Sequence, residues 1–136
     1  MLFRSRANAS FNFSDISSVP GPNNRLASQT PVSANIGVDY KIDGTPLTVG
    51  GNYGYQGAGE VRIAADRTAY ATPKRVVDVY ALWKFDPKTS LRASVSNWLH
   101  QDNLSQSTYY NTAGSIVQTN YTPTTVTFRA MFEHKF

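Results

Sequence analysis

Apolar and polar residues alternate along six separate segments of this chain, with a period of two. In the last segment, residues 126–136, Val126, Phe128 and Phe132 share one side, and Arg129 and Glu133 share the other. The earlier segments with this pattern are 3–14, 33–42, 47–56, 76–85 and 91–96. Successive side chains of a β-strand point to opposite faces, so the pattern predicts six amphipathic strands. No segment places apolar residues at helical spacing, and we therefore expect essentially no helix.

The connections between these segments alternate in length. Residues 43–45 and 86–88 are short and contain the turn-forming pairs Asp-Gly and Asp-Pro. Residues 15–30, 60–74 and 103–121 are long, polar connections. Short turns at one end and long loops at the other are typical of bacterial outer-membrane β-barrels. The pattern predicts that the tight turns face the periplasm and the three long loops face outward.

Composition agrees with a membrane protein that crosses by strands. The chain has 136 residues, 40% of them apolar, and its mean hydropathy is −0.37. No run approaches the about 20 apolar residues that a membrane helix needs, but a barrel strand exposes only alternate residues to lipid. The absence of cysteine excludes disulfides and thiolate metal sites. The net charge of +4 is scattered, which argues against a nucleic-acid interface.

Alternation alone also fits a soluble β-sandwich, whose apolar face is the core. Three features favour a membrane: long segments, aromatic residues near their ends, and charges of both signs in the polar register. Examples of these opposite charges are Asp39 with Lys41 and Arg129 with Glu133, which suit a hydrated lumen. We expect an inner aromatic rim of Phe3, Tyr40, Trp83, Phe85 and Phe136, and an outer rim of Phe11, Phe13, Tyr53 and Tyr55.

Six strands are too few for a closed barrel. Bacterial single-chain barrels begin at eight strands, and an open edge would leave unpaired backbone groups in hydrocarbon. We therefore expect further strands upstream of Met1. On this interpretation all 136 residues form one unit, an antiparallel transmembrane β-barrel segment of about six strands that is the C-terminal part of a larger barrel.

Several motifs occur in the order of a known family. The stretch from Val79 to Phe85 is followed by a tight turn and residues 91–97, and Asn97–Asn103 is similar to an Asn-Leu-Phe-Asp-like motif after a penultimate strand, although the Leu-Phe pair is replaced. Residues 46–51 and 128–136 complete the set. Together they resemble TonB-dependent outer-membrane receptors, especially the siderophore-receptor branch.

This resemblance implies a function. The chain would be the last six strands of a 22-stranded barrel in the bacterial outer membrane, importing a scarce nutrient, with a ferric siderophore as the expected ligand. Its partners would be outer-membrane lipid, the barrel assembly machinery, the ligand, and the TonB complex through a plug domain outside this sequence. The alternatives are another outer-membrane barrel, namely an autotransporter translocator or a porin, or a soluble all-β binding domain.

The resemblance also assigns a role to the C-terminal aromatic residues. Phe128, Phe132 and Phe136 share the apolar register of the last segment. In such barrels, a terminal aromatic and the alternating apolar positions form the signal that the assembly machinery binds. Strand addition supplies the physical basis, because backbone pairing is combined with pockets for alternate side chains. The alternative is that Phe136 is only an interfacial anchor.

Two long connections supply candidate ligand contacts. They are Arg62, Arg67 and Tyr70 in one, and Tyr109, Tyr110 and Gln118 in the other. Arginine and tyrosine suit an anionic, aromatic ligand through charge-assisted hydrogen bonds and stacking. Each could equally be an ordinary solvated loop residue. We expect Arg92 and Arg129, in the polar register, to pair with acidic residues of the barrel or plug.

We expect no catalytic, cofactor or metal site. Ser96, His100 and Asp102 have the residue types of a nucleophilic triad, but triads are defined by geometry and a polar cluster at a strand end is the simpler interpretation. The chain has two histidines, His100 and His134, and no cysteine, which is too few ligands for a metal site.

Overall fold

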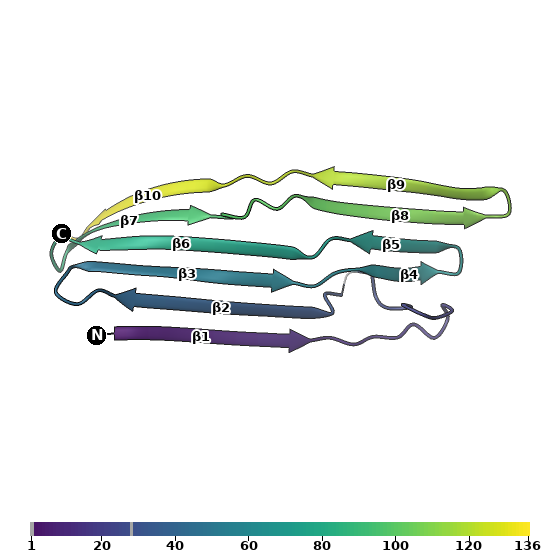
Figure 1. Cartoon of the computed structure of the whole chain (residues 1–136), viewed down its shortest axis with the longest axis horizontal. Helices are drawn as coiled ribbons and strands as arrows, with labels where there is room; N and C mark the ends of the chain where they lie inside the picture. Colours follow the sequence, from purple (N-terminus) through teal and green to yellow (C-terminus); the bar gives the residue numbers. More distant parts are fainter. Residues whose placement is uncertain (1, 28) are drawn as a thin grey trace.

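The computed structural model describes residues 2–27 and 29–136, and within them the chain forms ten β-strands and no helix (Figure 1). No helix that could span a membrane is therefore present in the described residues. Met1, before which we expect upstream strands, lies outside them. The strands are β1 (Leu2–Phe11), β2 (Val32–Lys41), β3 (Leu47–Gln56), β4 (Glu60–Ala64), β5 (Arg67–Ala71), β6 (Lys74–Lys84), β7 (Thr89–Ser96), β8 (Asn103–Asn111), β9 (Gly114–Thr122) and β10 (Thr127–His134).

The six predicted segments form one antiparallel sheet, which we call the wall sheet. Its order is β1-β2-β3-β6-β7-β10, so every segment pairs with its neighbour in the predicted series. The registers bring the apolar positions of all six strands to the same face. One row across the sheet consists of Phe3, Tyr40, Val49, Ala81, Ala93 and Ala130. The prediction of an all-β, antiparallel chain is confirmed.

Aromatic residues lie near both ends of the wall strands. Phe3 pairs with Tyr40 beside the tight turn between β2 and β3, and Phe11 pairs with Val32 at the opposite end. Trp83 lies beside Leu91 at the turn between β6 and β7. Aromatic residues of the apolar register thus border both margins of the apolar face.

The two short connections are tight turns, as predicted. In the first, the N–H of Ile42 donates to the carbonyl of Leu47 at 3.1 Å, and Gly44 takes a φ of 73° that favours glycine. In the second, a carboxylate oxygen of Asp86 accepts the N–H of Lys88 at 2.7 Å. A short polar side chain that bonds the backbone two residues on is the feature that makes aspartate a turn residue.

Two of the three connections predicted as long loops are instead β-hairpins, and this part of the prediction is wrong. Residues 60–74 contain β4 and β5, and residues 103–121 contain β8 and most of β9. These strands form a second antiparallel sheet, β4-β5-β8-β9, which we call the loop sheet. Figure 1 shows the loop sheet beyond the ends of the wall strands, on the side away from the two tight turns. Within the described residues, the remaining connection, 15–30, contains no strand.

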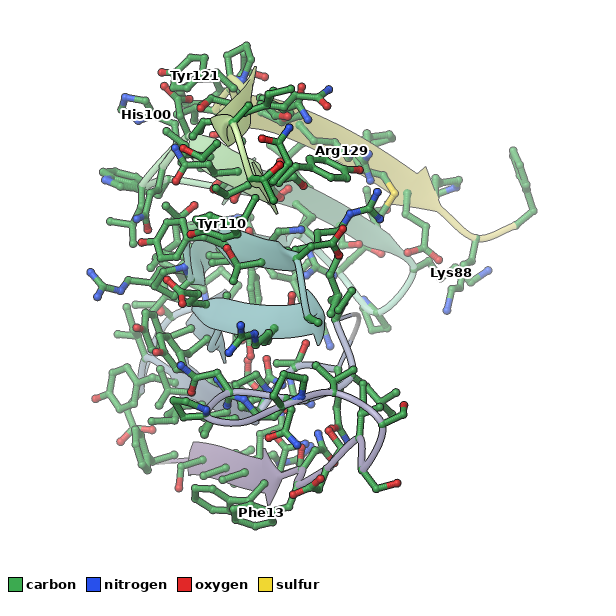
Figure 2. The ribbon with its side chains drawn as sticks, turned by 90° about the vertical axis from the view of Figure 1, so that its right-hand side faces the viewer. Phe13, Lys88, His100, Tyr110, Tyr121 and Arg129 are labelled. Carbon is green, nitrogen blue, oxygen red and sulfur yellow. The ribbon has the colours of Figure 1, made fainter. Side chains whose placement is uncertain are left out.

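Neither sheet has a core. Among the described residues, no hydrophobic side chain is buried, and on the apolar face Phe128, Phe132 and Phe3 are 77%, 65% and 62% exposed. The view along the strands in Figure 2 shows open sheets, with Phe13 near the β1 edge and Tyr121 near the opposite edge. The described residues do not close a barrel, and β1 and β10 remain the edges of the wall sheet.

Candidate functional site

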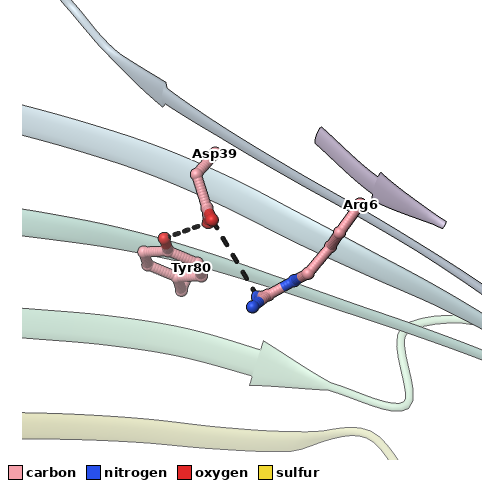
Figure 3. A network of polar contacts seen from close by, with 3 residues as sticks. All are labelled: Arg6, Asp39 and Tyr80. Carbon is pink, nitrogen blue, oxygen red and sulfur yellow. Dashed lines mark hydrogen bonds and ion pairs between the residues drawn. The ribbon is translucent and has the colours of Figure 1, made fainter. Parts of the chain in front are cut away.

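The polar face of the wall sheet carries a network of charged and aromatic side chains from four strands. Asp39 on β2 lies 3.9 Å from the guanidinium of Arg6 on β1 and accepts a hydrogen bond from the hydroxyl of Tyr80 on β6 (Figure 3). The guanidinium of Arg92 on β7 stacks 4.4 Å from the centre of the Tyr80 ring. These contacts link side chains of β1, β2, β6 and β7 across the intervening strand β3.

Gly50 on β3 makes this network possible. It pairs with Asp39 on one side and Tyr80 on the other, so these two side chains must meet across it. A Cβ at Gly50 would lie 2.5 Å from the Tyr80 ring and 2.6 Å from the Asp39 carboxylate. Only glycine leaves room for this contact.

Around the network, the polar face is hollowed by a depression of about 390 Å³. Its ionisable lining consists of Arg6, Asp39, Asp78, Tyr80, Arg92 and Arg129. At neutral pH three guanidinium groups face two carboxylates there, so this surface suits hydrated and anionic groups.

Two acidic residues of the polar register form ion pairs. Among the described residues, the ion pair of Asp39 is with Arg6 rather than Lys41, and that of Glu133 is with Lys135 at 3.7 Å rather than with Arg129. Spacing along one strand cannot identify the partner of Asp39, because that side chain comes from the neighbouring strand, β1. Arg92 contacts an aromatic ring, and Arg129 borders the depression.

The loop sheet separates the six candidate ligand contacts into two sets. Its registers pair Arg67 with Tyr109, and place Gln118 on the same face as these two. Alternation puts Arg62, Tyr70 and Tyr110 on the other face. One ligand on one face of the sheet can contact only one set.

Arg67 and Tyr109 form a preorganised pair. The guanidinium lies 4.0 Å from the centre of the tyrosine ring and also donates a hydrogen bond to its hydroxyl. Arg62 has a different environment. Its N–H donates to the carbonyl of Asn23 at 2.7 Å, and its guanidinium donates to the carbonyl of Ala65 at 3.0 Å. The bond to Asn23 attaches segment 15–30 to β4, and the bond to Ala65 fixes the turn after β4. Arg62 therefore has a structural role.

The motif from Asn97 to Asn103 forms the junction between the two sheets. Asn97 takes a φ of 56°, its N–H donates to Asp78 at 2.9 Å, and its amide donates to the carbonyl of Thr125 at 3.0 Å. Asp102 accepts the N–H of Thr124 at 2.8 Å and the hydroxyl of Tyr121. The junction therefore attaches the end of β7 and the start of β8 to β9 and to the connection between β9 and β10.

The hydrogen bond between Asp102 and Tyr121 shifts both titrations. It lowers the pKa of the Asp102 carboxyl, helped by the N–H of Thr124. It raises the pKa of the Tyr121 hydroxyl, because it stabilises the protonated phenol beside a carboxylate. The pair is most stable with Asp102 ionised and Tyr121 neutral.

The structure does not join Ser96, His100 and Asp102 into a relay. The two oxygens of Asp102 accept from Tyr121 and Thr124, and Nδ1 of His100 lies 3.4 Å from the carbonyl oxygen of Trp98. At the other histidine, Nδ1 of His134 lies 2.9 Å from the hydroxyl of Thr89, and its ring stacks edge-on against Phe136.

The three C-terminal aromatic residues are open to solvent. Phe128 pairs with Val95 and Phe132 with Leu91, so both lie on the apolar face of the edge strand β10. Phe136 follows the end of β10 and is fully exposed. Their apolar side chains and the free edge of β10 thus lie together, as strand addition requires.

The sequence pattern predicted a polar cluster at the strand end near Asp102, but it identified neither the partners of Asp102 nor the network around Asp39. For the network, the available signal was Gly50, a glycine in the polar register of β3. Its neighbours across the sheet, Asp39 and Tyr80, are both polar. For the junction, the available signal was Asp102, an isolated aspartate between the alternating segments 91–96 and 126–136.

No family model matches this chain, and no significant match is found among curated proteins or solved structures.

Proposed function

We propose that this chain forms part of the wall of an outer-membrane β-barrel that imports a scarce nutrient in a TonB-dependent manner. The observation that supports the membrane location is the wall sheet, whose apolar positions share one face that no other layer covers. The Asp, Glu, Lys and Arg residues of these strands lie on the opposite face, except Arg75, which pairs with Tyr55 near the end of β6.

Lipid is the environment that stabilises such a surface. Full burial of one large apolar side chain contributes about 1.5–3 kcal/mol relative to exposure to water, and this sheet leaves many of them exposed. In hydrocarbon the same surface has no unfavourable contact with water, while the antiparallel ladders satisfy the backbone. The free edges of β1 and β10 require further strands to pair with. If this chain is the C-terminal part of a 22-stranded barrel, the rest of that barrel would provide them.

In this arrangement the polar face lines an aqueous passage, and the loop sheet projects outside the membrane. The Arg67–Tyr109 pair offers a cation and an aromatic ring to an anionic, aromatic ligand, as a ferric siderophore is. Phe128, Phe132 and Phe136 supply the signal for barrel assembly. The choice of a siderophore rests on the family resemblance and on this pair.

Site-directed labelling tests the membrane location. The chain contains no cysteine, so Ala93→Cys on the apolar face and Ser94→Cys beside it on the polar face can each carry a single environment-sensitive fluorophore. After dilution from urea into phosphatidylcholine vesicles, we expect brominated lipid to quench the label at Ala93→Cys and not at Ser94→Cys. Equal quenching, or a folded chain that ignores the vesicles, would contradict the proposal. A folded chain in water with only the Ala93→Cys label protected would support the soluble β-domain.

Ligand binding is tested separately. In the assembled receptor, Arg67→Ala should weaken binding of a ferric catecholate, whereas Tyr70→Ala on the other face of the loop sheet is the matched control. Equal losses in both variants would remove the assignment of the Arg67–Tyr109 pair.

A further inference from the structure

The outer edge of β9 is an open strand edge. Within the described residues β9 pairs with β8 alone, and its register runs without interruption from Gly114 to Thr122. Every residue of the strand is exposed. Figure 1 shows β9 along one margin of the molecule, with nothing beside its outer side. Alternate backbone N–H and C=O groups of such an edge are available to another strand.

The opposite edge of the same sheet is covered by the chain itself. Asn23 accepts the N–H of Arg62 through its carbonyl at 2.7 Å, and the guanidinium of Arg25 donates to the carbonyl of Glu60 at 3.2 Å. Segment 15–30 thereby occupies the free side of β4. The chain protects one edge of the loop sheet and leaves the other open.

β9 also lacks the features that normally prevent edge pairing. Natural edge strands carry charged residues, proline or a bulge that interrupts pairing. No residue between Asp102 and Arg129 has a charged side chain, no proline occurs within β9, and its pairing with β8 has no bulge. The other three edge strands carry Arg4 and Arg6 in β1, Glu60 and Arg62 in β4, and Arg129 and Glu133 in β10.

We propose that this edge pairs with β9 of a second copy of the chain, antiparallel about a two-fold axis. The register that pairs all nine residues places Gln118 opposite Gln118 of the second copy. It also places Val117 opposite Thr119, and Ser115 opposite Tyr121. No charges meet, and β-branched, hydroxyl, aromatic and amide side chains face one another, which are favourable cross-strand pairs. A two-fold axis repeats every contact except that of Gln118 with its own copy, which lies on the axis.

A disulfide test follows directly from this register. Opposed residues of an antiparallel pair have Cα atoms about 4.5–5.5 Å apart, within the range that a disulfide spans. In micelles of dodecyl maltoside, which cover the apolar face of the wall sheet, Gln118→Cys should form a covalent dimer under mild oxidation. Gln106→Cys, on the inner strand β8, is the matched control and should remain monomeric. Equal cross-linking of the two variants, or none at Gln118→Cys, would overturn the proposal.

A second pair of variants separates the edge from the face. Val117→Lys introduces a charge on the edge strand, and Thr108→Lys introduces the same charge directly opposite it on β8 of the same copy. In sedimentation equilibrium, Val117→Lys should raise the dimer dissociation constant by at least about tenfold, because symmetry applies the change twice. Thr108→Lys should change it little. Equal weakening would place the contact on the sheet face, and a dimer that survives Val117→Lys would place it on another edge; either result overturns the proposal.

This inference concerns the 136-residue chain by itself, without the further strands that the proposed barrel would place along β10. Micelles support the β9 test whether or not the chain inserts into vesicles. A chain that fails to insert but forms the Gln118→Cys dimer refutes the membrane proposal alone. One that inserts and stays monomeric refutes the dimer alone.

Discussion

The wall sheet and the loop sheet have the same backbone architecture and different surfaces. Both are antiparallel and both are open. In the wall sheet, the apolar register occupies one face, and the Asp, Glu, Lys and Arg residues other than Arg75 occupy the other. In the loop sheet, tyrosines occupy both faces, with Tyr109 on one and Tyr70 on the other, and β8 and β9 carry no charge.

This difference shows that the ladder of backbone hydrogen bonds does not determine the side-chain pattern. An antiparallel ladder forms with almost any side chains that avoid proline, while the surroundings on each side select which residues are tolerated. The proposed wall has lipid on one side and water on the other, whereas the loop sheet has water on both. The contrast can be tested residue by residue.

The largest effect should come from a charge on the apolar face. Val79 pairs with Gly51 and Val95 in the middle of the wall sheet, and Val79→Arg should destabilise the membrane-inserted chain by roughly 2–4 kcal/mol. Asn52→Arg, at the same depth on the polar face, should change stability much less. Urea titration of both variants in vesicles measures the difference. Similar losses in the two variants would show that the faces do not differ in environment.

A smaller loss should follow from filling the space over Gly50. Gly50→Ala forces the Tyr80 ring and the Asp39 carboxylate apart, at a cost of about 1–3 kcal/mol by overpacking. Gly54→Ala is the control, because the nearest atom there is the end of the Asn35 side chain at 3.1 Å. Urea midpoints compare the two. Gly50→Ala with unchanged stability would mean that the network around Asp39 contributes nothing.

Phe136→Ser should separate assembly from stability. The side chain is fully exposed, so the substitution should change the free energy of unfolding by less than about 0.5 kcal/mol. The amount of the assembled receptor in the outer membrane should nevertheless fall, while ligand affinity of the assembled fraction stays the same. Fractionation and immunoblotting measure this amount. Normal accumulation of Phe136→Ser would leave Phe136 as an anchor only.

The smallest effect concerns pH at the base of the β8–β9 hairpin. The pKa of Asp102 is lowered from 3.8, so its stabilising contribution is complete above that value and is lost as pH falls below it. The pKa of Tyr121 is raised from 10.0, so its contribution is present below that value and is lost as pH rises above it. Hydrogen exchange of residues 103–122, corrected for intrinsic rates, should be slowest between these limits.

Asp102→Asn provides the control for this titration. The variant should lose the acid-side change in exchange and keep weaker protection throughout the range. Persistence of the acid-side change in Asp102→Asn would assign it to another group.

The wall sheet could be predicted from sequence because its two faces carry different kinds of residue. Alternation in segments such as 33–42 and 47–56 therefore identified the strands, and the Asp-Gly pair identified the turn between them. The loop sheet could not be predicted in this way. In β8 and β9, serine, threonine and tyrosine occupy both faces, which leaves no periodic signal.

The candidate site was predicted only at the level of residue types. Arg67 and Tyr109 were both selected, but their contact depends on the pairing of β5 with β8, which are distant in sequence. For the same reason, the partner of Asp39 proved to be Arg6 rather than a neighbour on its own strand. Local spacing identifies which side of a strand a residue occupies, and it carries no information about the strand alongside.

The missing core has a thermodynamic consequence. With no apolar side chain buried among the described residues, unfolding in water would expose little new hydrocarbon surface. Both the heat-capacity increment and the denaturant slope should then lie well below those of a globular domain of this length. On the membrane proposal, most of the folding free energy comes from transfer of the apolar face out of water. Folding and partitioning into a second phase are then one equilibrium.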